Sequence, residues 1–207
     1  PDCLPNQFYK SFSADLAKPM AEAFNESHQT GSLPDSCMEG LISILYKKKD
    51  RDDPRNYRPI TLLNCDYKVL TRILCRRMNE AVVQFVSQQQ NGFVPGGFIA
   101  ENLMLLKLIQ AYVEEEDEDA YFLFLDMEKA FDRCSWEYLL EALDAIGFGE
   151  GFIGYIKLFY SQDNPPNRQL TSNGYVGEKF ELGSGVAQGC PLSPLLFLVI
   201  TEALSRL

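Results

Sequence analysis

The sequence places one acidic residue at the end of a strongly apolar run, AYFLFLD at residues 120–126. Such a short run, rich in aromatic residues, predicts a buried β-strand. A carboxylate buried at its end without a partner would be costly, so it should either be neutralised or hold something positive. Because Mg²⁺ prefers oxygen ligands, Asp126 is a candidate metal ligand. An Asp that caps the following turn is the plain alternative.

The composition is that of an ordinary globular chain. Of the 207 residues, 46% are hydrophobic and 23% are charged, as in typical domains. The longest apolar run, at 194–200, is much shorter than the roughly 20 residues of a membrane-spanning helix, so no membrane partner is expected. The six cysteines include no Cys-x-x-Cys pair, which favours reduced thiols in an intracellular compartment, nuclear or cytoplasmic.

The charges are unevenly distributed along the chain. The net charge is −10, yet residues 47–77 hold ten Lys and Arg against four Asp, a local charge of +6. This segment is either a solvated cationic face or a surface that meets phosphate groups. Its first part lies between β-rich runs at 41–47 and 57–63, which predicts a hairpin with a basic tip.

The pattern of apolar residues predicts the α+β class, because helices and strands occur without a regular βαβ alternation. Asn173-Gly174 predicts a further hairpin within 169–185. Pro19 is expected to kink or split the first helix. Helices are expected at 5–28, 66–90, 100–113, 135–149, 150–161 and 193–207. The absence of a GxGxxG or Walker A sequence argues against Rossmann and P-loop nucleotide sites.

A second chemistry-bearing stretch is GVAQGCPLSPLLF at residues 185–197. Gly189 would let a ligand approach the backbone closely, and the neighbouring Gln188 offers both a donor and an acceptor. An ordinary tight turn into a buried helix, with Pro194 near its first position, explains the same pattern.

Several motifs together resemble those of reverse transcriptases, in order and spacing. They are NYRPITLLNCDYKVLTRIL, QNGFVPGG, FLDMEKAFD and GVAQGCPLSPLLF, and the resemblance covers nearly the whole chain. The resemblance is strongest to LINE-type, non-LTR retrotransposon polymerases, with group II intron maturases as neighbours. It implies a right-hand polymerase fold, with fingers at 1–118 and an incomplete palm at 119–207. It also implies RNA-directed DNA synthesis on an RNA template and a DNA primer, from dNTPs, with a pair of Mg²⁺ ions.

The resemblance assigns roles around the metal and the sugar. Asp126 would be the catalytic, metal-binding carboxylate, and the backbone carbonyl of Met127 would be a further metal ligand. Phe131 would be a steric gate that collides with a ribose 2′-OH and so favours dNTPs. Asp132 is expected to cap the following helix or to pair with a cation rather than to bind metal.

The resemblance also assigns roles to residues that contact phosphates and bases. Arg58 and Lys68 would contact the triphosphate, and Gln188 and Gly189 would line the nascent base pair. The basic residues of the hairpin tip would form an electrostatic fringe near template or triphosphate: Lys47, Lys48, Lys49, Arg51 and Arg55.

The chain departs from the family pattern in one important respect. Such polymerases carry a second carboxylate pair on a later hairpin, whereas the Asp52-Asp53 pair of this chain lies in a polar turn far upstream. One carboxylate is a poor site for two Mg²⁺ ions, so the chain alone is expected to be inactive, with the rest of the palm and the thumb outside it. Gly97 and Ala187 stand where the family commonly has basic residues, which would weaken phosphate contacts.

Two other interpretations remain open. A decayed copy of the same element would be a catalytically inactive remnant that still binds nucleic acid. A Mg²⁺-dependent phosphohydrolase that uses the carboxylates of residues 126–132 would need further acidic or histidine ligands, and the chain has a single histidine.

Overall fold

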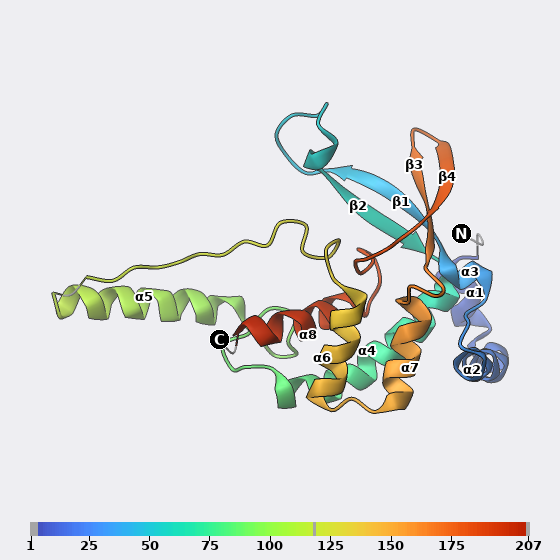
Figure 1. Ribbon diagram of the computed structural model, residues 1–207, viewed down its shortest axis with the longest axis horizontal. Coiled ribbons are helices and arrows are strands. Elements are labelled where there is room, and N and C mark those ends of the chain that lie inside the picture. The colour runs from blue at the N-terminus through green and yellow to red at the C-terminus, as the bar shows by residue number, and fades with distance from the viewer. Residues whose placement is uncertain (1–3, 118, 206–207) are drawn as a thin grey trace.

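The computed structural model describes residues 4–117 and 119–205. A small sheet stands at one end of the molecule above a layer of helices, and one helix projects far to the side (Figure 1). The helices are α1 (Asn6–Ser11), α2 (Ser13–Thr30), α3 (Asp35–Met38), α4 (Cys65–Phe85), α5 (Ile99–Glu115), α6 (Trp136–Ile146), α7 (Glu150–Phe159) and α8 (Ser193–Ser205). The strands are β1 (Glu39–Tyr46), β2 (Tyr57–Leu63), β3 (Asn167–Ser172) and β4 (Tyr175–Glu181). The predicted α+β class is confirmed.

The sheet is mixed, with the strand order β2-β1-β3-β4. The predicted basic hairpin is confirmed, since β1 and β2 are antiparallel with Ser43 opposite Ile60. The β3–β4 hairpin turns at Asn173 and Gly174, whose φ angles of 52° and 82° suit a tight two-residue turn. Strand β3 runs parallel to β1, so the sheet joins segments on both sides of residue 118, where the fingers were expected to end. That boundary stays a prediction.

The core lies among the helices below the sheet. Leu139 and Leu143 of α6, Ile156 of α7 and Leu196 of α8 are completely buried. Sequence signals correctly mark α6: the Ser135 side chain accepts a hydrogen bond from the Tyr138 N–H, and Gly147 ends the helix with a φ of 99°. The α6–α8 packing places the loop before α8 close to the start of α6.

The first helical segment breaks, but not at the proline. Helix α2 continues through Pro19, and the break lies at Phe12, whose φ of −106° and ψ of 23° leave the helical range. A proline removes one main-chain hydrogen bond, here to the carbonyl of Asp15. The turns on either side are long enough to hold the helix together without it.

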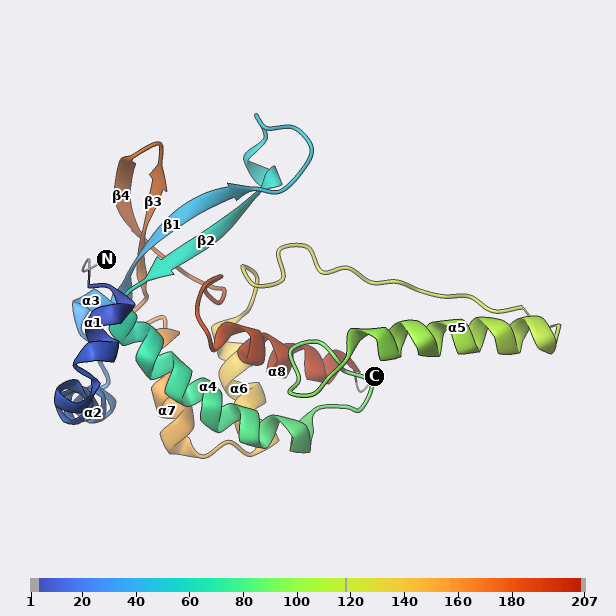
Figure 2. The same cartoon turned by 180° about the vertical axis from the view of Figure 1, so that it is seen from behind.

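The predicted strand at 120–126 is wrong. These residues form no regular element, and their side chains are exposed, with Tyr121 at 95% and Leu123 at 84%. The segment returns from the far end of α5 toward the body of the molecule and joins no sheet on the way, in both views (Figures 1 and 2). A strand is stabilised by pairing and by burial against its neighbours. Among the described residues, no strand pairs with this segment. Helix α5 offers no packed surface to bury it, since none of the helix's own residues is buried.

None of the helices in the described ranges combines the length and the apolar character that a membrane crossing requires.

Candidate active site

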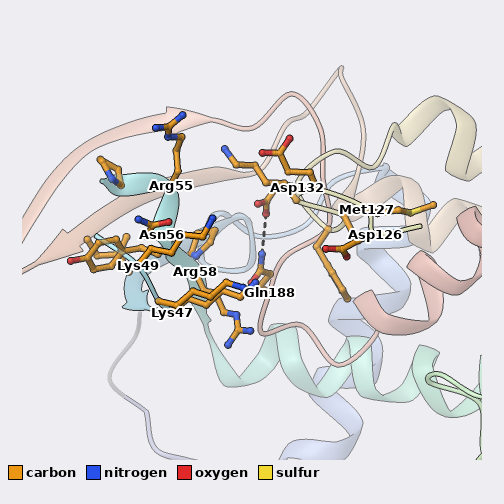
Figure 3. A pocket seen from close by; sticks show the side chains of 18 residues that line it. Lys47, Lys49, Arg55, Asn56, Arg58, Asp126, Met127, Asp132 and Gln188 are labelled. Atoms are coloured by element: carbon orange, nitrogen blue, oxygen red, sulfur yellow. Dashed lines mark hydrogen bonds between the residues drawn. The ribbon is translucent and has the colours of Figure 1, made fainter. Parts of the chain in front are cut away.

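A cleft of about 730 Å³ lies between the β1–β2 hairpin, the segment 126–132 and the loop at Gln188. Figure 3 shows basic side chains of the hairpin on one side and Asp126, Met127 and Asp132 on the other. The cleft brings together most of the residues that the sequence singled out: Lys47, Lys48, Lys49, Arg55, Arg58, Asp126, Met127, Phe131 and Gln188.

The basic wall is held by a tightly bonded turn. The Tyr46 hydroxyl donates to the Lys49 carbonyl at 2.6 Å, and the Tyr57 hydroxyl donates to the Arg51 carbonyl at 2.8 Å. Lys49 has a positive φ of 71°, which the contact to its carbonyl stabilises. The lysines therefore project from a fixed backbone toward the cleft, as an anion site requires.

One cation of the wall is already neutralised. The Arg55 guanidinium lies 3.0 Å from an Asp53 carboxylate oxygen, and its hydrogen bond holds the pKa of Asp53 below the ordinary value. Arg58, on β2, is exposed and forms no ion pair within the described residues. Within the described residues, the unpaired positive charge of the cleft thus comes from the three hairpin lysines and Arg58 on this wall, and from Lys129 on the segment 126–132.

Asp126 lies opposite this wall on an exposed backbone. Among the described residues its side chain has neither a hydrogen bond nor an ion pair, and no group of three or more His, Cys, Asp or Glu is close enough together to hold a metal. A free carboxylate next to the Met127 carbonyl supplies the oxygen atoms that Mg²⁺ prefers. These donors fit part of a metal site, not a complete one.

Phe131 forms the floor of the cleft. Its ring stacks on Phe197 of α8, with 5.2 Å between ring centroids and 18° between planes. It also meets the edge of Phe93 at 6.4 Å. The ring is half-buried and lines both the main cleft and a smaller adjoining cavity of about 300 Å³. The contacts with these two rings restrict its plane, as a steric gate would need.

The loop that carries Gln188 is tied to β2. The Thr61 N–H donates to the Gln188 carbonyl at 2.7 Å. Gly189 has a φ of +134°, and a Cβ there would lie 2.3 Å from the Thr61 carbonyl oxygen. The close approach that requires glycine here is therefore to the protein's own strand. Gly189 lines the smaller cavity, beside Phe131 and Gln188.

Asp132 departs from its expected role. Ser135, not Asp132, caps α6, and no ion pair of Asp132 occurs within the described residues. Its Oδ1 instead accepts a hydrogen bond from Gln188 Nε2 at 3.2 Å, drawn as a dashed line in Figure 3. The sequence contained no signal for this pair, because the contact joins two loops distant in the chain.

Some predicted residues lie elsewhere. Lys68 is half-buried on α4 and Arg51 stands 4.9 Å above the Tyr46 ring, and neither lines the cleft. Ala187 is buried beside the smaller cavity. At Gly97 a Cβ would lie 2.5 Å from the Asn91 carbonyl oxygen, so the present loop has no room for a larger residue. The roles assigned to Lys68 and Arg51 stay predictions.

Comparison with known families identifies the chain. Residues 46–207 match the family described as reverse transcriptase (RNA-dependent DNA polymerase). The matched range contains the whole basic hairpin tip, the Asp126 segment and the Gln188 loop, which are the three sides of the cleft.

Individual relatives come from mobile elements. The chain is 32% identical over 97% of its length to the transposon TX1 uncharacterized 149 kDa protein of Xenopus laevis, and covers 15% of that protein. It is 30% identical over 85% of its length to the Pol polyprotein of the type-2 retrotransposable element R2DM of Drosophila melanogaster, and covers 16% of it. It is 25% identical over 97% of its length to the RNA-directed DNA polymerase from mobile element jockey of the same species, and covers 22% of it. The chain spans less than a quarter of each of these relatives and belongs to the reverse transcriptase family, in the group carried by non-LTR retrotransposons.

Proposed function

We propose that this chain forms the nucleotide-facing part of an RNA-directed DNA polymerase site that residues outside it complete. One observation carries the proposal: a cleft of about 730 Å³ has lysines and Arg58 on one wall and the free Asp126 carboxylate on the other. A triphosphate carries charge that the first wall would offset, and a metal-bound triphosphate needs an oxygen ligand such as the second wall offers. The substrates would be dNTPs, with RNA as template and DNA as primer.

The residues of the cleft would divide the work. Arg58 and the hairpin lysines would bind the triphosphate, and Gln188 and Gly189 would line the nascent base pair. Phe131, fixed against Phe197, would exclude a ribose 2′-OH by shape. Asp126 and the Met127 carbonyl would hold Mg²⁺, which when bound activates the primer 3′-OH and stabilises the leaving pyrophosphate.

The chain alone would supply too few carboxylates for this chemistry. Asp126 is unpaired, whereas Glu128 and Asp132 beside it are bonded to Arg133 and Gln188, and the described residues hold no group of three or more His, Cys, Asp or Glu that could bind a metal. We therefore expect the isolated 207-residue chain to incorporate no dNTP. The same observation favours a second candidate, a remnant that binds nucleic acid through the basic hairpin and does not polymerise.

Primer extension on an RNA template tests the proposal. The complete reading frame that encodes this segment should extend the primer, and Asp126→Asn should lower the rate by about a thousandfold or more, because a lost metal ligand removes several kcal/mol of transition-state stabilisation. Glu141→Gln, an exposed acid on α6, is the charge control and should extend normally. Template binding without extension by the unsubstituted protein would favour the inactive remnant, and normal extension by Asp126→Asn would refute the proposed site.

A further inference from the structure

The strongest unassigned feature of the cleft is the contact between Asp132 and Gln188. Both side chains line the cleft and both are half-buried. The Gln188 Nε2 donates to Asp132 Oδ1 at 3.2 Å (Figure 3). A hydrogen bond to a charged acceptor is stronger than one between neutral groups, so this contact can hold a side chain that would otherwise rotate.

The backbones that carry the two side chains are locked together. The Val186 N–H donates to the Phe131 carbonyl and the Gly185 N–H donates to the Cys134 carbonyl, each at 2.8 Å. The Ser184 hydroxyl donates to the Asp132 carbonyl at 3.3 Å. These bonds flank the side-chain contact, so the distance from Asp132 to Gln188 is set by the fold rather than by the two side chains alone.

Gly185 shows how close the loop at 184–188 lies to the turn at 131–134. Gly185 has a φ of +90°, and a Cβ there would lie 2.8 Å from the Asp132 carbonyl oxygen. On its other side the Gln188 carbonyl accepts from the Thr61 N–H of β2 at 2.7 Å. The backbone of Gln188 is therefore held by hydrogen bonds from two directions. Only the orientation of its side-chain amide is not set by these bonds.

The Asp132 carboxylate restricts the rotation of the Gln188 amide and selects one of its two ends. An ionised Asp only accepts hydrogen bonds, so it selects the NH₂ end of the Gln188 amide and leaves Oε1 and the second N–H to the cleft. We propose that Asp132 is a positioning residue that fixes the Gln188 carboxamide in the orientation that receives the incoming dNTP. The inference rests on the proposed polymerase function and deepens it, because it names what orients a residue at the nucleotide.

If Asp132 positions Gln188 through a hydrogen bond, variants of these two residues should change the dNTP affinity in a pattern that loss of the Asp132 charge alone would not produce. Asp132→Ala should raise the dNTP dissociation constant about tenfold, the scale of one lost charge-assisted hydrogen bond. Asp132→Asn should keep most of the affinity, because its Oδ1 still accepts from Gln188. Gln188→Ala should weaken binding similarly, and adding Asp132→Ala to it should cause no further loss.

The experiment is single-turnover incorporation by the complete reading frame, with the maximal rate and the dNTP dissociation constant measured separately. Equal losses in Asp132→Ala and Asp132→Asn would mean that Asp132 acts through its charge, and would overturn the inference. Additive losses in the double variant would overturn it as well. Glu141→Gln should match the unsubstituted enzyme.

A second variant pair covers the case in which Asp132→Ala does not fold. Gln188→Glu sets two carboxylates face to face and should weaken dNTP binding. Adding Asp132→Asn restores a donor and an acceptor, and should recover at least about threefold of the lost affinity; no recovery would overturn the inference. Failure of the wider function is distinguishable, since it would appear as normal incorporation by Asp126→Asn, whatever the Asp132 variants do.

Discussion

Two segments face the same cleft, and they are built in opposite ways. The loop at residues 184–190 is tied to the turn at 131–134 and to β2 by main-chain hydrogen bonds, and Val186, Ala187 and Cys190 within it are buried. The segment 119–127 has no regular structure, and the large apolar side chains before Asp126 face solvent. The groups proposed to bind the nucleotide are thus preorganised, and the proposed metal ligand is not.

The difference between the two segments shows which of them contributes to the stability of the chain. Burying a large apolar side chain contributes about 1.5–3 kcal/mol, and the Asp126 segment forgoes that contribution at Leu123, Phe124 and Leu125. The Gln188 loop obtains its order from contacts that all lie within the described residues. The Asp126 carboxylate, at the end of an unburied run, is therefore placed less firmly than the Gln188 loop across the cleft.

The largest effect on the contrast between these two segments is expected from a substitution at Gly189, in the anchored loop. Gly189→Ala puts a Cβ 2.3 Å from the Thr61 carbonyl oxygen at a φ of +134°, so the loop must move away from β2. We expect the free energy of unfolding to fall by about 3 kcal/mol. Chemical denaturation of the 207-residue chain measures this change.

Gly183→Ala is the matched control for that substitution. A Cβ at Gly183 meets no atom within 4 Å, so we expect a change below about 0.5 kcal/mol. Equal stability of the Gly189 and Gly183 variants would show that the loop is not anchored on β2.

Local patterns predicted much of this architecture. The basic hairpin, the caps of α6 and the Asn173-Gly174 turn follow from residues that are neighbours in the sequence. The parallel pairing of β1 with β3 and the Asp132–Gln188 contact do not, because they join segments far apart in the chain. The apolar run before Asp126 has strand-forming residues, but a strand also needs a partner, which local sequence does not reveal.

A smaller effect should appear at Cys134, which lies beneath the anchored loop. Burial raises the pKa of its thiol to about 11, and the Asp132 carboxylate adds to the rise. The unfolded chain releases this proton near pH 9 and the folded chain keeps it to near pH 11. The stability is thus unaffected below pH 9 and falls as the pH rises between these values.

Measurement of unfolding at pH 8 and pH 10 isolates this contribution when Cys134→Ala is compared with the unsubstituted chain. The unsubstituted chain should lose about 1 kcal/mol more than the variant over this interval. Identical pH dependence of the two proteins would mean that the thiol is open to water, and that the loop covers it less tightly than the hydrogen bond from Gly185 to Cys134 indicates.

The smallest effect is expected in the Asp126 segment, at Leu123. Leu123 is 84% exposed, so Leu123→Ser in the 207-residue chain should change the free energy of unfolding by less than about 0.5 kcal/mol. Leu139→Ala in the completely buried part of α6 should cost about 3 kcal/mol in the same assay. A loss above about 1 kcal/mol at Leu123 would show that the run is packed in solution, and the contrast between the two segments would then disappear. If Leu123→Ser is silent in this chain but destabilises the complete reading frame, residues outside the chain bury the run, and the carboxylate at its end becomes fixed only when they do.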